Sequence, residues 1–104
     1  MKTKIGFDFD GTLGKYLLLQ TYAKELVKNE TYVCVITKRN PNLSQEVFDL
    51  CLPLGILQEN IIFTNNLTKV PIVNELELTK FYDDEELNIN EINKYTNAIG
   101  ILVK

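Results

Sequence analysis

Short apolar runs alternate with helical segments along the chain, and this alternation constrains the fold more than any other feature of the sequence. Five strands are expected, over residues 4–9, 32–36, 61–64, 80–82 and 98–103. Four helices are expected between them, over residues 15–29, 42–54, 71–78 and 84–95. Strands that alternate with helices form a parallel sheet with helices on both faces, joined by right-handed crossovers. We expect the first strand to be central and the strand order to be 3-2-1-4-5.

The composition is that of a globular domain, and it excludes several classes of function. The chain has 104 residues, which predicts a single domain over residues 1–104. No histidine is present, which removes histidine bases and histidine-ligated zinc. The net charge is −3 and the longest basic run is Lys38-Arg39, so we expect no nonspecific nucleic-acid binding.

The distribution of charges and cysteines predicts a cytoplasmic protein. No apolar stretch approaches the roughly 18 residues of a membrane span, so no membrane association is expected. Asp8 and Asp10 interrupt the apolar run near the N-terminus, which a secretory signal would not tolerate. Cys34 and Cys51 stand in apolar segments, which is typical of buried, reduced thiols.

Polar and charged side chains follow the predicted strands at their carboxyl ends. The residues that matter most are Asp8, Asp10, Thr37, Lys69, Asp83 and Asp84. In open parallel sheets ligands bind outside the carboxyl ends of the strands, so these side chains should converge on one crevice. Four carboxylates in one crevice repel one another, and a bound cation would relieve that repulsion. Ligands that are all oxygen favour Mg²⁺.

These residue types suit phosphoryl transfer. One aspartate can attack phosphorus and form an aspartyl-phosphate, while a second can protonate the leaving oxygen and later activate water. A threonine hydroxyl and a lysine ammonium can hold the phosphoryl oxygens. A tight turn at Gly11 can also point backbone N–H groups at a phosphate.

Four segments of the chain, in order, resemble the motifs of the haloacid dehalogenase-like (HAD) superfamily. The segment Phe7-Asp8-Phe9-Asp10-Gly11-Thr12-Leu13 resembles its DxDGT signature. The three later segments are Val35-Ile36-Thr37, Lys69, and Phe81-Tyr82-Asp83-Asp84. The resemblance spans essentially the whole chain and implies a Rossmann-like three-layer α/β sandwich with a five-stranded parallel sheet. It also implies a Mg²⁺-dependent phosphatase that works through an aspartyl-phosphate.

The resemblance implies a role for each motif residue. Asp8 would be the nucleophile and a Mg²⁺ ligand, and Asp10 would be the general acid and base, with its backbone carbonyl on the metal. Thr37 and Lys69 would bind phosphate, and we expect Gly11 and Lys38 to assist them.

The paired aspartates of the last motif would complete the metal site. Either Asp83 or Asp84 could be the direct ligand, and we expect Asp84 because it aligns with the aspartate of the family's Gly-Asp variant. Lys80 competes with Lys69 for the phosphate-binding role, but it opens the fourth strand, far from the carboxyl end. Arg39 follows Thr37 on the same edge, where it could contact substrate or remain a solvated loop residue.

The segments between the motifs leave no room for the cap domain that many family members carry. In the family, the absence of a cap goes with macromolecular substrates or with subunits that close one another's sites. The predicted partner is therefore a phosphorylated small molecule or an exposed phosphate on a macromolecule, and a homo-oligomer could close the site. The paired-aspartate motif occurs in nucleotidases of the superfamily, which favours a nucleotide substrate.

Two other interpretations share parts of this pattern. A catalytically idle HAD-like regulatory or binding domain would have the same fold without turnover, although every motif residue is present. A receiver domain also uses an aspartate, Mg²⁺, a threonine and a lysine on a five-stranded parallel sheet. Receivers place the phosphorylated aspartate after the third strand, whereas here the candidate nucleophile follows the first, so the order of the motifs disfavours a receiver.

Overall fold

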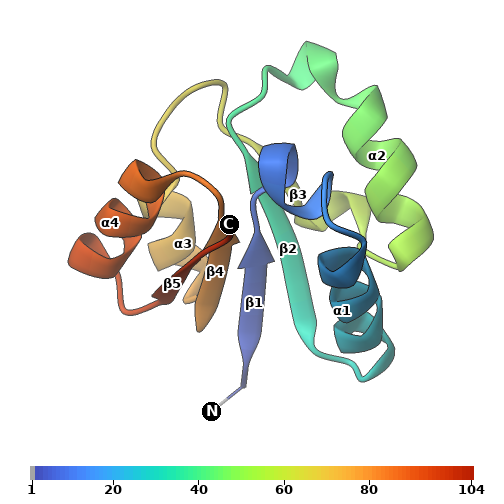
Figure 1. The fold of residues 1–104 in the computed structure, drawn as a ribbon, viewed down its shortest axis with the longest axis horizontal. Coiled ribbons are helices and arrows are strands. Elements are labelled where there is room, and N and C mark those ends of the chain that lie inside the picture. The colour runs from blue at the N-terminus through green and yellow to red at the C-terminus, as the bar shows by residue number, and fades with distance from the viewer. Residues whose placement is uncertain (1) are drawn as a thin grey trace.

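The computed structural model describes residues 2–104 and contains one five-stranded parallel sheet. The strand order is β3-β2-β1-β4-β5, which confirms the order predicted from the sequence (Figure 1). The strands are β1 Lys4–Phe7, β2 Tyr32–Thr37, β3 Ile61–Phe63, β4 Lys80–Asp83 and β5 Ile99–Leu102. Because Phe7 at the end of β1 lies opposite Val35 of β2 and Tyr82 of β4, the three central strands end side by side.

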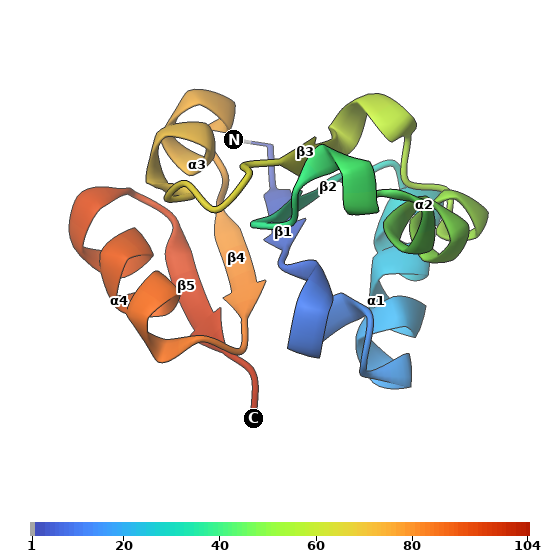
Figure 2. The ribbon, with the colours of Figure 1, turned by 90° about the horizontal axis from the view of Figure 1, so that it is seen from above.

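In the described part of the chain, four α-helices cover the sheet in two layers. They are α1 Leu17–Lys28, α2 Gln45–Cys51, α3 Val70–Leu76 and α4 Glu86–Tyr95. Figures 1 and 2 show α1 and α2 on one face of the sheet and α3 and α4 on the other. The connection from β1 to β2 holds a short turn and α1, and that from β2 to β3 holds α2 with single helical turns. Both connections are therefore too short for an inserted domain.

The core is divided by the sheet because successive side chains of a strand point to opposite faces. Phe7 and Val35 belong to the cluster that includes Val47 of α2. Phe81 belongs to the second cluster, with Ile92 of α4. Cys34 and Cys51 are buried and free, as the sequence predicted, and burial raises the pKa of each thiol to about 12.

All four helices differ from the expected bounds by one or more residues, and the differences at α2 and α4 have a local cause. The helix expected over residues 42–54 is divided into a 3₁₀ turn Pro41–Leu43, α2, and a second 3₁₀ turn Leu52–Leu54. Pro53 has no N–H to continue the α-helical ladder, and Gly55 ends the segment with a φ of 94°. The helix expected from residue 84 begins instead at Glu86. Among residues 2–104, no helix combines the length and the apolar character needed to cross a membrane.

Candidate functional site

A tight turn follows β1 and fixes Asp8 at the carboxyl edge of the sheet. The backbone N–H of Asp8 donates to the carbonyl of Tyr82 at 2.8 Å, so β1 stays paired with β4 up to this residue. The chain then turns through Phe9–Leu13, and the N–H of Leu13 donates back to the Asp8 carbonyl at 3.1 Å. The Asp8 side chain is consequently held in a buried position, with 7% of the residue exposed.

Gly11 lets this turn approach the loop after β4. Its φ is 74°, a conformation that favours glycine, and a Cβ at this position would overlap the Asp84 carboxylate. The close approach brings the first and last candidate motifs against each other. Glycine is required here both by backbone conformation and by space.

Lys69 joins two buried aspartates into one charged cluster. It lies immediately before α3, and its Nζ lies 2.7 Å from Asp8 Oδ1 and 3.0 Å from Asp83 Oδ2. Lys69 is 2% exposed and Asp83 is fully buried. Two carboxylates therefore share one ammonium in a region from which water is largely excluded.

Asp83 is held by three donors. Besides Lys69, the Asn88 side chain donates to Oδ2 at 3.0 Å, and the backbone N–H of Glu85 donates to Oδ1 at 3.0 Å. The bond from Glu85 explains why α4 begins two residues later than expected, because Asp83 satisfies an N–H ahead of the first turn. With both oxygens of Asp83 occupied, its carboxylate has a fixed orientation.

Asp84 has the opposite environment, although it is adjacent in sequence. It is exposed, and one of its oxygens lies 3.4 Å from the Thr12 hydroxyl, which is also 3.2 Å from Asp8 Oδ2. Thr12 is fully buried, and its two contacts place the hydroxyl between the carboxylates of Asp8 and Asp84. Asp84 is consequently the member of the pair whose carboxylate is accessible from solvent.

The carboxylates of Asp8, Asp83 and Asp84 could hold a metal ion. One oxygen from each lies within 4.8 Å of the others. Within residues 2–104, only one ammonium, that of Lys69, contacts this group of three acids. Burial, opposed by Lys69 and reinforced by Asp83, raises the pKa of Asp8 from 3.8 to about 7. A divalent cation bound by oxygen would supply the missing positive charge, and the donors suit Mg²⁺.

An open cavity of about 340 Å³ lies above this cluster. It is lined by Asp8, Asp10, Gly11, Lys38, Lys69, Asp84 and Glu85. Two lysines therefore face the same space as the Asp8 carboxylate, which is a suitable environment for an anionic ligand beside a nucleophile.

Thr37 and Lys38 are held at the end of β2 by backbone contacts. The Thr37 carbonyl accepts from the N–H of Thr64, and the Lys38 carbonyl accepts from the N–H of Asn66, each at 2.8 Å. Thr37 is buried, and its hydroxyl oxygen accepts from the backbone N–H of Arg39 at 3.2 Å. That hydroxyl retains its own proton for a further acceptor.

Asp10 is placed differently from the other acids. It lines the cavity, but both of its oxygens accept hydrogen bonds from Arg39, at 2.9 Å from Nε and 2.7 Å from Nη2. Hydrogen bonding from Arg39 lowers the pKa of the Asp10 carboxyl and raises that of the guanidinium. The structure thus gathers three of the four predicted acids by their carboxylates, and pairs the fourth with an arginine.

Thr12, Arg39 and Asn88 complete the site beyond the residues singled out as its core. Thr12 belongs to the first motif and Arg39 follows the second, so the sequence carried a signal for both. Asn88 had none, because an asparagine on a helix gives no indication that its side chain will meet Asp83. Lys80 opens β4, and its charge is absent from the cluster that Lys69 joins.

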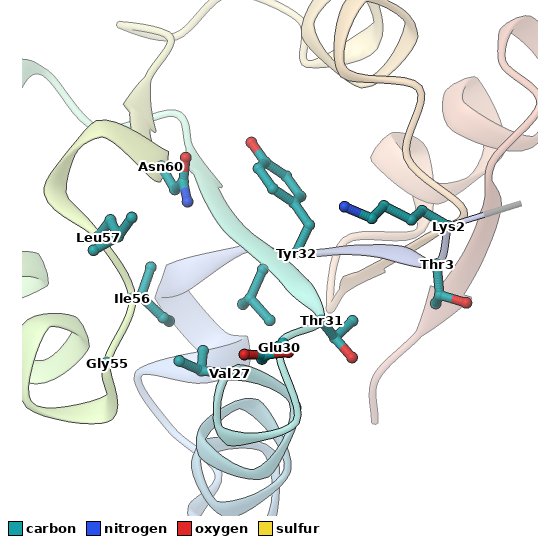
Figure 3. Close-up of a pocket in the computed structure, with 11 residues that line it drawn as sticks. Lys2, Thr3, Val27, Glu30, Thr31, Tyr32, Gly55, Ile56, Leu57 and Asn60 are labelled. Atoms are coloured by element: carbon teal, nitrogen blue, oxygen red, sulfur yellow. The ribbon is translucent and has the colours of Figure 1, made fainter.

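A separate cavity of about 500 Å³ lies at the opposite end of the strands (Figure 3). Its lining includes Lys2 and Thr3 before β1, Tyr32 at the start of β2, and Asn60 before β3. Ligands of open parallel sheets bind at the carboxyl ends, and none of the predicted site residues reaches this cavity. The carboxyl edge is the better candidate for chemistry.

No protein-family model matches the chain, and no curated protein matches it either. The interpretation of the site consequently depends on its own geometry and chemistry.

Proposed function

We propose that this protein is a Mg²⁺-dependent phosphatase of the HAD type, which hydrolyses phosphomonoesters through an aspartyl-phosphate on Asp8. The observation that carries the proposal is the position of Asp8. Its carboxylate is buried in a cavity, 2.7 Å from Lys69 and within reach of two further carboxylates. A buried carboxylate beside a lysine and a cation site is what attack on an anionic phosphate requires.

The residues present fit a magnesium ion. Asp8 and Asp84 both line the cavity and would be its direct carboxylate ligands. Asp83, whose oxygens are occupied by Lys69, Asn88 and the Glu85 N–H, would support the site from behind. When bound, the ion would neutralise charge on the phosphate and let a carboxylate approach it.

The first step transfers the phosphoryl group to the protein. An oxygen of Asp8 forms a bond to phosphorus as the ester P–O bond breaks. Asp10, after it has left Arg39 and taken up a proton from solvent, gives that proton to the departing oxygen. Lys69 and Lys38 bind the nonbridging phosphoryl oxygens, and the free hydroxyl proton of Thr37 supports the same group.

The second step releases phosphate and restores the protein. Asp10, now ionised, takes a proton from a water molecule that attacks phosphorus. The bond between phosphorus and the Asp8 oxygen breaks, and inorganic phosphate leaves. The proton that Asp10 gave in the first step is thereby recovered, so both aspartates return to their initial states.

The test is a screen for phosphate release over a panel of nucleoside monophosphates, sugar phosphates and aryl phosphates, with Mg²⁺ or with EDTA. We expect turnover with Mg²⁺, no turnover in EDTA, and none in Asp8→Asn, because a carboxamide is a poor nucleophile. Lys80→Met is the matched control, because that lysine lies at the amino end of β4, and it should retain wild-type activity. Turnover that persists in EDTA or in Asp8→Asn would contradict the proposal.

One observation favours the idle regulatory or binding domain as a second candidate. The general acid and base of the proposed mechanism is held by Arg39 through both of its oxygens. If no phosphomonoester is hydrolysed while Mg²⁺ and phosphate still bind at Asp8 and Lys69, the idle domain is the correct assignment. In the substrate screen, nucleoside monophosphates are tested first, because the paired aspartates resemble those of nucleotidases.

A further inference from the structure

Arg39 is held by more than its pair with Asp10. Its Nη1 donates to the Leu43 carbonyl at 3.2 Å, and its Nη2 pairs with Glu46 at the start of α2. Its guanidinium carbon lies 5.1 Å from the centre of the Phe9 ring. None of these contacts involves the Asp10 side chain, so the guanidinium has anchors besides the carboxylate that it binds.

Asp10 lies between two neighbouring cavities. It lines the cavity that contains Asp8 and Lys69, and together with Gly11 it also lines a second cavity of about 420 Å³. The second cavity is lined by Phe9, Asp10, Gly11, Gly14, Lys15, Arg39, Glu46 and Leu50. With its phosphate beside Asp8, a phosphomonoester would extend its leaving group across Asp10 into this second space.

The charges of the second cavity are balanced only while Asp10 stays there. Lys15 and Arg39 face Asp10 and Glu46, two cations against two carboxylates. A change of side-chain rotamer that takes the Asp10 carboxylate into the first cavity leaves two cations with one carboxylate. The vacated fork of Arg39 then presents the paired N–H donors that fit a carboxylate or phosphate.

We infer that Arg39 is a recognition site for a second anionic group on the leaving side of the substrate, and that this group takes the place of Asp10. The inference rests on the proposed phosphatase function and narrows its substrate class to phosphomonoesters whose leaving group carries a carboxylate or a second phosphate. Binding of that group releases Asp10 to act on the leaving oxygen. Substrates without a second anion must break the pair between Asp10 and Arg39 without replacing it.

The test compares phenyl phosphates that carry a carboxylate, a phosphonate or a neutral carboxamide at the same ring position. Wild type should prefer the two anionic substrates over the carboxamide by roughly ten- to hundredfold in kcat/KM, the effect expected of one bidentate charged contact. The carboxylate and phosphonate arms distinguish a carboxylic acid from a phosphate as the natural group. Arg39→Gln should lose the preference for the two anionic substrates, because the paired N–H donors that would bind the second anion are removed.

Two variants control for charge and shape. Lys24→Gln removes the same charge from the exposed surface of α1 and should keep the preference. Arg39→Lys keeps the charge without the forked guanidinium, and it should keep only part of the preference for anionic substrates. The inference is overturned if wild type shows no preference, or if Arg39→Gln lowers kcat/KM equally on all three substrates.

A binding measurement separates failure of this inference from failure of the proposed function. In the Asp8→Asn background, which prevents turnover, calorimetric titration compares binding of the carboxylate and carboxamide substrates with Mg²⁺ present. Tighter binding of the carboxylate that disappears on adding Arg39→Gln supports the anion site even if the wild-type protein hydrolyses nothing. Equal binding of both substrates refutes it, whatever the activity.

Discussion

Replacement of Lys69 by methionine tests the electrostatics of the site most severely. Lys69 is the shared partner of two buried carboxylates, at 2.7 Å from Asp8 and 3.0 Å from Asp83. Methionine preserves the length of the side chain and removes the ammonium. The variant therefore leaves two acids in a largely dry region without the cation that faces them.

The magnitude follows from the burial of the three groups. Removing one partner of a buried ion pair costs about 3–5 kcal/mol, because the remaining charge is uncompensated. For a domain of this size each kcal/mol lowers Tm by roughly 4–8 °C, so we expect a loss of roughly 12–40 °C in EDTA. Excess Mg²⁺ should raise the Tm of Lys69→Met more than that of wild type, because the cation replaces part of the lost charge.

The assay is thermal unfolding followed by circular dichroism, with and without Mg²⁺. Lys80→Met is the matched control, since Lys80 forms no ion pair with the site acids, and it should change stability by less than about 1 kcal/mol. Adding Asp8→Asn to Lys69→Met should recover part of the loss, because one uncompensated carboxylate is removed. If Lys69→Met unfolds at the same temperature as Lys80→Met, the charged cluster does not stabilise the fold as argued.

Three further predictions concern the acids and the turn. In the absence of divalent cations, the free energy of unfolding should fall by roughly 2–4 kcal/mol between about pH 4 and pH 7. The reason is that folded Asp8, with a pKa of about 7, binds a proton that the unfolded chain has released over this range. Urea titrations of Asp8→Asn should show a flatter pH profile. Asp84→Asn should weaken Mg²⁺ binding with little loss of stability, whereas Asp83→Asn should mainly lower stability. Calorimetric titration measures the first effect and thermal unfolding the second, and the reverse pattern would contradict these roles. Gly11→Ala should cost about 1–3 kcal/mol in urea unfolding and also weaken Mg²⁺ binding, because of its positive φ and the nearby Asp84 carboxylate; wild-type behaviour would refute this account of the turn.

The sheet could be predicted from the sequence because its signals are local. Each strand is a short apolar run, and alternation with helices leaves few ways to connect parallel strands. Once β1 is central, the carboxyl ends of β1, β2 and β4 must adjoin, which brings Asp8, Thr37 and Asp83 to one edge. Convergence of the acids thus followed from topology without knowledge of any side-chain conformation.

The pairing of Asp10 with Arg39 could not be predicted in this way. Both residues stand on loops after adjacent strands, and their contact depends on rotamers and on the anchoring of Arg39 by Leu43 and Glu46. The role of Asn88 was equally hidden, since it depends on how α4 packs against the end of β4. Topology brings groups to one edge, whereas side-chain packing decides which of them meet.

The direct test of the central claim is to trap the phosphorylated residue. The protein is mixed with Mg²⁺ and an aryl phosphate, quenched in acid within one turnover, reduced with borohydride and mapped by peptide mass spectrometry. We predict modification at Asp8 in wild type, none in Asp8→Asn, and a longer-lived modification in Asp10→Asn, where water activation is impaired but an aryl group leaves with little protonation. Phosphate release without a trapped acyl-phosphate, or modification at Asp10 in place of Asp8, would contradict the mechanism.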